Sequence, residues 1–152
     1  MSVLEGATGS GAPPCIRVLI ADDHALVRSG LARLVRGAPD LELVGTAADG
    51  VSAVELAVSE QPDVVVLDLS MPGLDGVSAA GQMRVKAPHS RILVLSSYSH
   101  ESVVTAAFAA GVRGYLLKDV TPRAVLDGIR DTYAGGAPMS ERIRRTMEPL
   151  QQ

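Results

Sequence analysis

Cysteine and aromatic side chains are scarce in this chain of 152 residues. Cys15 is the single cysteine, only one phenylalanine and three tyrosines occur, and tryptophan is missing. One thiol cannot form an internal disulfide, and it provides too few ligands for a cysteine metal site. These shortages exclude a fold held by internal disulfides and a metal centre built on cysteine.

Long apolar runs and an excess of charge of one sign are missing as well. Apolar runs such as residues 64–67 are far too short to span a bilayer. The first six residues lack the basic start and apolar stretch of a secretory signal. A net charge of −3, with no long basic stripe, gives no sign of a nucleic-acid surface. We therefore expect a soluble, cytoplasmic domain that does not contact a membrane.

The size and the apolar content predict one compact domain with a short leader. An apolar fraction of 47% with a small net charge excludes intrinsic disorder, and the length suits a single core. Residues 1–14 are rich in Gly, Ala, Ser and Pro and are expected to form a flexible leader. Residues 6–11 superficially resemble a phosphate-binding loop. Because no strand precedes them, a linker is the favoured interpretation.

From Ile16 onward, apolar strands alternate regularly with amphipathic helices. The expected strands are residues 16–21, 41–48, 63–68, 91–96 and 114–117. Five helices are expected. The first ends near Gly37, the next three span about residues 50–61, 76–86 and 101–110, and the last runs from Pro122 to about Tyr133. Short, nearly continuous apolar strands indicate a parallel sheet covered on both faces, which is a doubly wound α/β fold. Any site should then lie at the carboxyl ends of the strands.

Polar side chains stand at four of those strand ends. They are Asp22 and Asp23, then Asp68, Ser96 and Lys118. Three adjacent carboxylates repel one another unless a cation shares the site, and hard oxygen ligands favour Mg²⁺ over zinc. A lysine and a hydroxyl facing that cation could hold the remaining oxygens of a phosphoryl group. The set therefore describes phosphoryl transfer to an aspartate.

Each of these residues also has an ordinary structural explanation. An Asp pair often caps a helix, Asp68 could simply end a strand, Ser96 could be a turn residue, and Lys118 could extend into solvent. Only two of the 14 basic residues are lysine, however, so Lys118 is not a routine surface residue. Their joint placement at four successive strand ends favours a common site.

Four segments carry a specific resemblance to a known family. They are Val18–His24 (VLIADDH), Asp68–Gly76 (DLSMPGLDG), Leu95–Tyr98 (LSSY) and Gly111–Lys118 (GVRGYLLK). Over about residues 16–135 the chain resembles the receiver domain of two-component response regulators. The sequences ADDH and GYLLKD are similar to those of the NarL/FixJ (LuxR-type) subfamily. The resemblance implies a flavodoxin-like (βα)5 three-layer sandwich with a parallel five-stranded sheet in the order 2-1-3-4-5.

The resemblance also implies a role for each site residue. Asp68 would accept a phosphoryl group from a phosphohistidine on a sensor histidine kinase. Mg²⁺ would be bound by Asp22, Asp23 and Asp68, with Asp22 acting largely through water, and by the backbone carbonyl of Ser70. Lys118 would pair with the phosphoryl oxygens.

Two further residues would carry the signal away from the site. Ser96 would donate to the phosphoryl group from the hydroxyl position of the family, and Tyr115 would move inward as Ser96 moves. A strand tyrosine that merely covers the sheet edge is the alternative for Tyr115. Phosphorylation would bias the face formed by the fourth helix, the fifth strand and the fifth helix, in a signalling domain that catalyses only its own phosphorylation and dephosphorylation.

The predicted domain organisation is a leader (1–14), a receiver domain (15–135) and a linker or tail (136–152). The tail could hold a short helix over 141–147 capped by Ser140. It is too short for the helix-turn-helix domain usual in the subfamily, so this chain alone is not expected to bind DNA. Self-association is an open expectation, through Leu26 and Gly30 on the first helix or through Val125 and Leu126 on the fifth, although these residues could simply pack on the sheet.

Two other functions compete with this interpretation. A haloacid dehalogenase-type phosphatase also uses an aspartate nucleophile with Mg²⁺, but it needs a second aspartate where Ser70 stands, and it gives no role to the acidic pair Asp22–Asp23. The other is a stand-alone or phosphate-independent receiver that acts as a protein-docking module. The complete set of site residues argues against the latter without excluding it.

Overall fold

The computed structural model describes residues 15–148, so the expected leader lies outside the described residues. Five parallel strands form one sheet in the order β3-β2-β4-β5-β6, which is 2-1-3-4-5 by position along the chain. The strands are β2 (Ile16–Ala21), β3 (Leu41–Ala47), β4 (Val64–Leu67), β5 (Arg91–Ser96) and β6 (Gly114–Leu117). The predicted sheet and its order are therefore confirmed.

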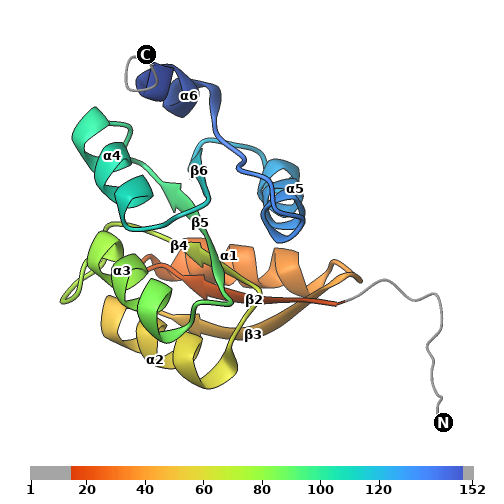
Figure 1. Cartoon of the computed structure of the whole chain (residues 1–152). Coiled ribbons are helices and arrows are strands. Elements are labelled where there is room, and N and C mark those ends of the chain that lie inside the picture. Colours follow the sequence, from red (N-terminus) through yellow and green to blue (C-terminus); the bar gives the residue numbers. More distant parts are fainter. Residues whose placement is uncertain (1–14, 149–152) are drawn as a thin grey trace, which may run out of the picture.

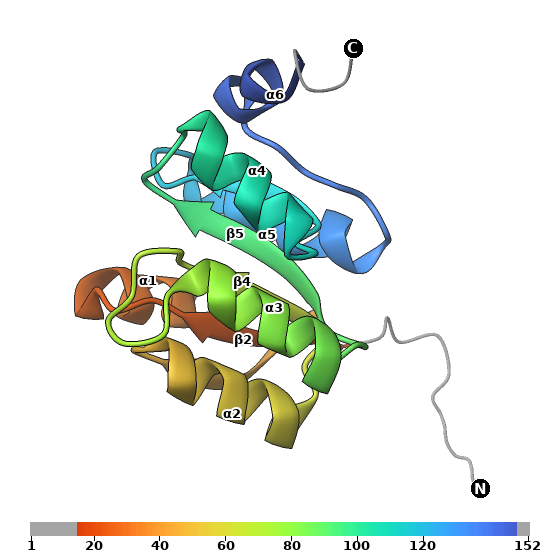
Figure 2. The same ribbon diagram turned by 60° about the vertical axis from the view of Figure 1, so that its left-hand side comes forward.

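Helices cover both faces of this sheet (Figures 1 and 2). They are α1 (Ala25–Arg36), α2 (Gly50–Glu60), α3 (Gly76–Lys86), α4 (Glu101–Ala109), α5 (Pro122–Tyr133) and α6 (Glu141–Met147). The buried residues of α1 and α5 share one hydrophobic cluster, and those of α2, α3 and α4 share the other. The molecule is the expected three-layer sandwich.

Side-chain caps fix where three of the helices begin. Asp49, Asp75 and Thr121 each accept a hydrogen bond from the backbone N–H three residues further along. These side chains satisfy N–H groups that have no partner within the first helical turn. Pro122 follows its cap at the first position of α5, where a missing N–H costs nothing.

The short central strand β4 joins the two halves of the core. Its four residues are at most 2% exposed, and they alternate between the two hydrophobic clusters. Full burial of each aliphatic side chain contributes about 1.5–3 kcal/mol. This fully buried strand, paired on both sides, leads directly to Asp68.

The segment after α5 packs against the domain more closely than the expected linker would. Helix α6 lies beside α4 at the top of Figure 1, and its Ile143 is fully buried. Ser140 stands at the N-cap position, but its side chain makes no cap. Its hydroxyl instead accepts a hydrogen bond from the N–H of Leu117, at 2.9 Å. The expected capping role of Ser140 is therefore wrong, because strand β6 uses that oxygen.

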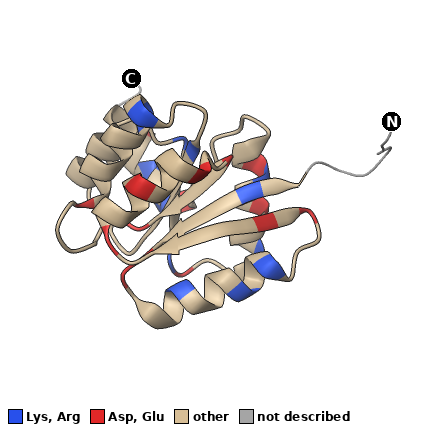
Figure 3. Ribbon diagram, turned by 90° about the horizontal axis from the view of Figure 1, so that it is seen from below, with Lys and Arg blue, Asp and Glu red and all other residues tan. Residues whose placement is uncertain are grey.

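The surface shows mixed charge and few large apolar side chains. In the view of Figure 3, acidic and basic residues are interspersed without a continuous basic stripe. Leu26 on α1 is 88% exposed, whereas Val125 on α5 is buried and Leu126 is partly buried. Of the two pairs considered for self-association, only the pair on α1 therefore contains an apolar residue that is open to solvent. Within residues 15–148, no helix has the length and apolar character needed to cross a membrane.

Candidate functional site

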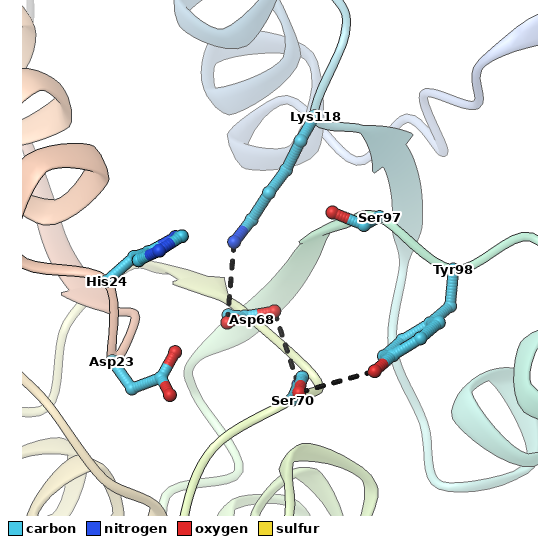
Figure 4. A pocket seen from close by; sticks show the side chains of 7 residues that line it. All are labelled: Asp23, His24, Asp68, Ser70, Ser97, Tyr98 and Lys118. Carbon is cyan, nitrogen blue, oxygen red and sulfur yellow. Dashed lines mark hydrogen bonds and ion pairs between the residues drawn. The ribbon is translucent and has the colours of Figure 1, made fainter.

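The carboxyl ends of the parallel strands converge on one cavity (Figure 4). Asp22 and Asp23 follow β2, Asp68 follows β4, and Lys118 follows β6. The cavity has a volume of about 280 Å³ and is lined by Asp23, His24, Asp68, Ser70, Ser97, Tyr98 and Lys118. The topology thus brings together side chains that are up to 96 positions apart in the sequence.

Three carboxylates form the acidic side of this site. One oxygen from each of Asp22, Asp23 and Asp68 lies within 4.8 Å of the others. Asp22 and Asp68 are buried, at 2% and 3% exposure, whereas Asp23 is exposed. Buried like charges so close together destabilise the ionised state unless a positive charge compensates them.

Lys118 supplies part of that compensation. Its Nζ lies 2.9 Å from Asp22 Oδ2 and 3.4 Å from Asp68 Oδ2. Partial burial on its own lowers the pKa of the ammonium group. The hydrogen bonds and negative charges of Asp22 and Asp68 together outweigh that effect, so the pKa of Lys118 is raised. Lys118 therefore stays charged against these two carboxylates.

Asp68 is held in a site that disfavours its negative charge. Burial raises the pKa of its carboxyl group, and the negative charge of Asp22 adds to this shift. The backbone N–H of Ser70, which donates to Asp68 Oδ1 at 3.2 Å, and the charge of Lys118 oppose the shift without cancelling it. A bound cation would favour the ionised form that a nucleophile needs.

The donor set fits Mg²⁺. Only carboxylate oxygens belong to the cluster, with no histidine or cysteine ligand, and this is the chemistry that Mg²⁺ prefers. Two of the three carboxylates are buried and share a single lysine, so the site retains negative charge for a cation. Asp22, Asp23 and Asp68 can hold the ion, and Ser70 lies at the cavity wall beside them.

The two residues expected to relay the signal lie behind the cavity. Ser96 is fully buried, and its Oγ accepts a hydrogen bond from the N–H of Tyr98, at 3.0 Å. Ser97, rather than Ser96, lines the cavity. Tyr115 is also fully buried: its hydroxyl donates to the carbonyl of Tyr98 at 2.6 Å, and burial raises the pKa of that hydroxyl. The ring already occupies an inner position, and exchange with a second position stays a prediction.

Three wall residues, His24, Ser97 and Tyr98, were absent from the predicted set. The backbone N–H of His24 donates to Asp22 Oδ1 at 2.9 Å and so orients that carboxylate. The hydroxyl of Tyr98 lies 3.5 Å from Ser70 Oγ across the cavity mouth. All three residues follow strand ends within the segments ADDH and LSSY, so their positions one or two residues beyond a predicted site residue were the available signal.

Comparisons with known proteins agree with this geometry. Residues 18–130 match the response regulator receiver domain. The chain is 40% identical over 126 residues to the nitrate/nitrite response regulator protein NarL of Escherichia coli K12. The matched segment covers 83% of this chain and 58% of that protein. The chain is 38% identical over 128 residues to the transcriptional regulatory protein LiaR of Bacillus subtilis, covering 84% and 61%. The chain thus spans less than two thirds of the length of these relatives.

Solved structures show the same likeness. A LuxR-family two-component response regulator from Aurantimonas sp. SI85-9A1 superimposes with a TM-score of 0.83 at 32% identity, covering 90% of this chain and 98% of that one. The signal receiver domain of NarL from Mycobacterium tuberculosis gives 0.71 at 38% identity, covering 78% and 98%. The chain belongs to the response regulator receiver domain family, in its NarL/FixJ (LuxR-type) group. It is therefore a signalling domain.

Proposed function

We propose that this receiver accepts a phosphoryl group on Asp68 from a phosphohistidine of a sensor histidine kinase. The Asp68 carboxylate attacks phosphorus, the P–N bond of the donor breaks as a P–O bond forms, and the imidazole leaves with the electron pair. The observation that carries this proposal is the cavity in which Asp68 faces Lys118 between two further carboxylates. The donor would meet this domain in the cytoplasm.

The remaining site residues would hold and neutralise the transferred group. Asp22, Asp23, Asp68 and the backbone carbonyl of Ser70 would bind Mg²⁺. When bound, the ion supplies positive charge to the carboxylates and to the phosphoryl oxygens. Lys118 pairs with one phosphoryl oxygen, for which it must loosen its contacts with Asp22 and Asp68. Ser97 and Tyr98 line the cavity beside these groups.

Phosphorylation would then redistribute charge and hydrogen bonds around Ser96. An aspartyl phosphate carries roughly −2 charge and three acceptor oxygens where one carboxylate charge stood. Ser96 does not line the cavity, so its hydroxyl would have to turn toward Asp68 to donate to that group. This turn would weaken its hydrogen bond with the N–H of Tyr98 and loosen the loop that also holds the Tyr115 hydroxyl. This change would reach the face formed by α4, β6 and α5.

The output that fits the relatives best is control of transcription. NarL is named as a response regulator and LiaR as a transcriptional regulatory protein. This chain covers only 58% and 61% of their lengths. We infer that the receiver acts through a C-terminal helix-turn-helix domain that is not part of this chain. DNA binding is not assigned to the chain itself.

The direct experiment is intact mass spectrometry after incubation with Mg²⁺ and phosphoramidate, whose P–N bond resembles that of phosphohistidine. We expect the wild type to gain one phosphoryl group and Asp68→Asn to gain none, with EDTA abolishing the gain. Asp119→Asn is a matched control, since Asp119 is exposed beside Lys118 but does not line the cavity. A folded wild type that gains nothing from several donors would favour a phosphate-independent docking module instead.

A further inference from the structure

The outer edge of strand β6 is closed by the chain's own C-terminal segment. Tyr115 N–H donates to the carbonyl of Pro138 at 2.9 Å, and Ser140 N–H donates to the carbonyl of Tyr115 at 3.1 Å. The Ser140 hydroxyl accepts a hydrogen bond from the N–H of Leu117, the next N–H of β6 that points away from β5. An edge strand normally presents such groups to solvent or to another chain. Here residues 138–140 act as a short sixth strand, parallel to β6 at Met139.

Side-chain packing fastens this segment to the domain. Ile143 is fully buried in the cluster that contains Tyr115, Leu117 and Val104. Gly114 makes the close approach possible, because a Cβ there would lie 2.7 Å from the carbonyl oxygen of Pro138. Residues 138–143 therefore pack directly against β6 and the core cluster beneath it.

The same strand carries two groups of the phosphoacceptor site. The Tyr115 main chain contacts residues 138–140, while its hydroxyl reaches the loop of Ser96 through the carbonyl of Tyr98. Leu117, bonded to the Ser140 hydroxyl, immediately precedes Lys118. β6 thus lies between the docked segment on its outer edge and Asp68 at its carboxyl end.

We propose that residues 138–143 are a positioning element of the phosphoacceptor site. They hold β6, and with it Tyr115 and Lys118, in the arrangement that serves Asp68. This inference rests on the proposed function. Because coupling between two events is reciprocal, occupation of the site strengthens docking of the segment, and docking strengthens occupation by the same factor. The receiver then extends beyond residue 135, and its C-terminal segment reports on the state of Asp68.

The test measures binding of beryllofluoride with Mg²⁺ to the full chain, together with hydrogen exchange of residues 137–147. In the wild type, beryllofluoride should slow exchange in this segment as well as at the cavity. Ile143→Ala should weaken beryllofluoride binding about fivefold or more, and Ile143→Leu should restore it. Gly114→Ala, which displaces Pro138 without touching the cavity, should act like Ile143→Ala.

Ile16→Ala is the control for a loss of stability alone. Ile16 is 5% exposed at the opposite end of the sheet, in the other cluster, so this variant loses a similar buried side chain far from the site. It should be destabilised and yet bind beryllofluoride as the wild type does. Equal binding by Ile143→Ala and the wild type overturns the positioning role alone. A wild type that binds no beryllofluoride overturns the proposed function as well.

Discussion

At the scale of single residues, the charge balance of the site depends on Lys118, which must compensate more than one carboxylate. Its ammonium group forms ion pairs with the two buried carboxylates, Asp22 and Asp68. The third carboxylate, Asp23, forms no ion pair with Lys118 in the described structure. Such a cluster is stable only while enough positive charge is present. A change in the charge of the site should therefore change the free energy of unfolding of the whole domain.

Replacing Lys118 tests this balance. Lys118→Met leaves two buried carboxylates unpaired and should lower the free energy of unfolding by about 1–3 kcal/mol. Because the added cation replaces the missing charge, Mg²⁺ should stabilise this variant more than it stabilises the wild type. Urea unfolding with and without Mg²⁺ measures both effects. Lys86→Met, at an exposed position, is the control and should change stability little.

Neutralising Asp68 should have the opposite effect on stability. Because burial raises the pKa of Asp68 in the folded state above that of the unfolded chain, its ionised form destabilises the fold. Asp68→Asn should thus unfold at a higher temperature than the wild type at neutral pH. The difference should shrink as the pH falls through the folded-state pKa and vanish below the unfolded-state value.

Thermal unfolding followed by circular dichroism over a pH series in metal-free buffer measures this difference. Asp119→Asn, exposed beside Lys118, should show no such gain. A difference between Asp68→Asn and the wild type that grows toward acid pH would contradict the assigned direction.

At the scale of elements, the helix caps fix where the loops after the strands end and the helices begin. Thr121 begins α5 directly after the loop that carries Lys118. Thr121→Ala should cost about 1 kcal/mol of stability, since the N–H of Ala124 loses its partner. Thr105→Ala, on the exposed side of α4, is the matched control and should cost less than about 0.5 kcal/mol. Chemical denaturation compares the two, and equal losses would argue against the cap.

The sequence predicted most element boundaries for the same local reasons. Asp75, Thr121 and Pro122 mark helix starts through side-chain and ring geometry that depends only on near neighbours. The docking of residues 138–140 on β6 could not be predicted in this way. This docking depends on a free strand edge that exists only in the assembled sheet. It also explains why Ser140, which stands at the N-cap position of α6, bonds to Leu117 and does not cap the helix.

At the scale of the whole molecule, the parallel sheet gathers the site. Asp22, Asp68 and Lys118 follow different strands, and their grouping was predictable because all strands of a parallel sheet end at one edge. What the sequence could not reveal is orientation. Ser96 faces the backbone of Tyr98 and not the cavity, and Tyr115 is already buried. These details depend on packing between distant segments.

Mapping the modified residue shows whether Asp68 itself accepts the phosphoryl group. The Mg²⁺-dependent product would be reduced with borohydride, which converts an acyl phosphate into a stable alcohol, and then digested and sequenced by tandem mass spectrometry. We expect reduction at Asp68 alone, and none in samples treated with EDTA. Reduction at Asp22 or Asp23, or at no aspartate in a chain that has gained a phosphoryl group, would contradict this expectation.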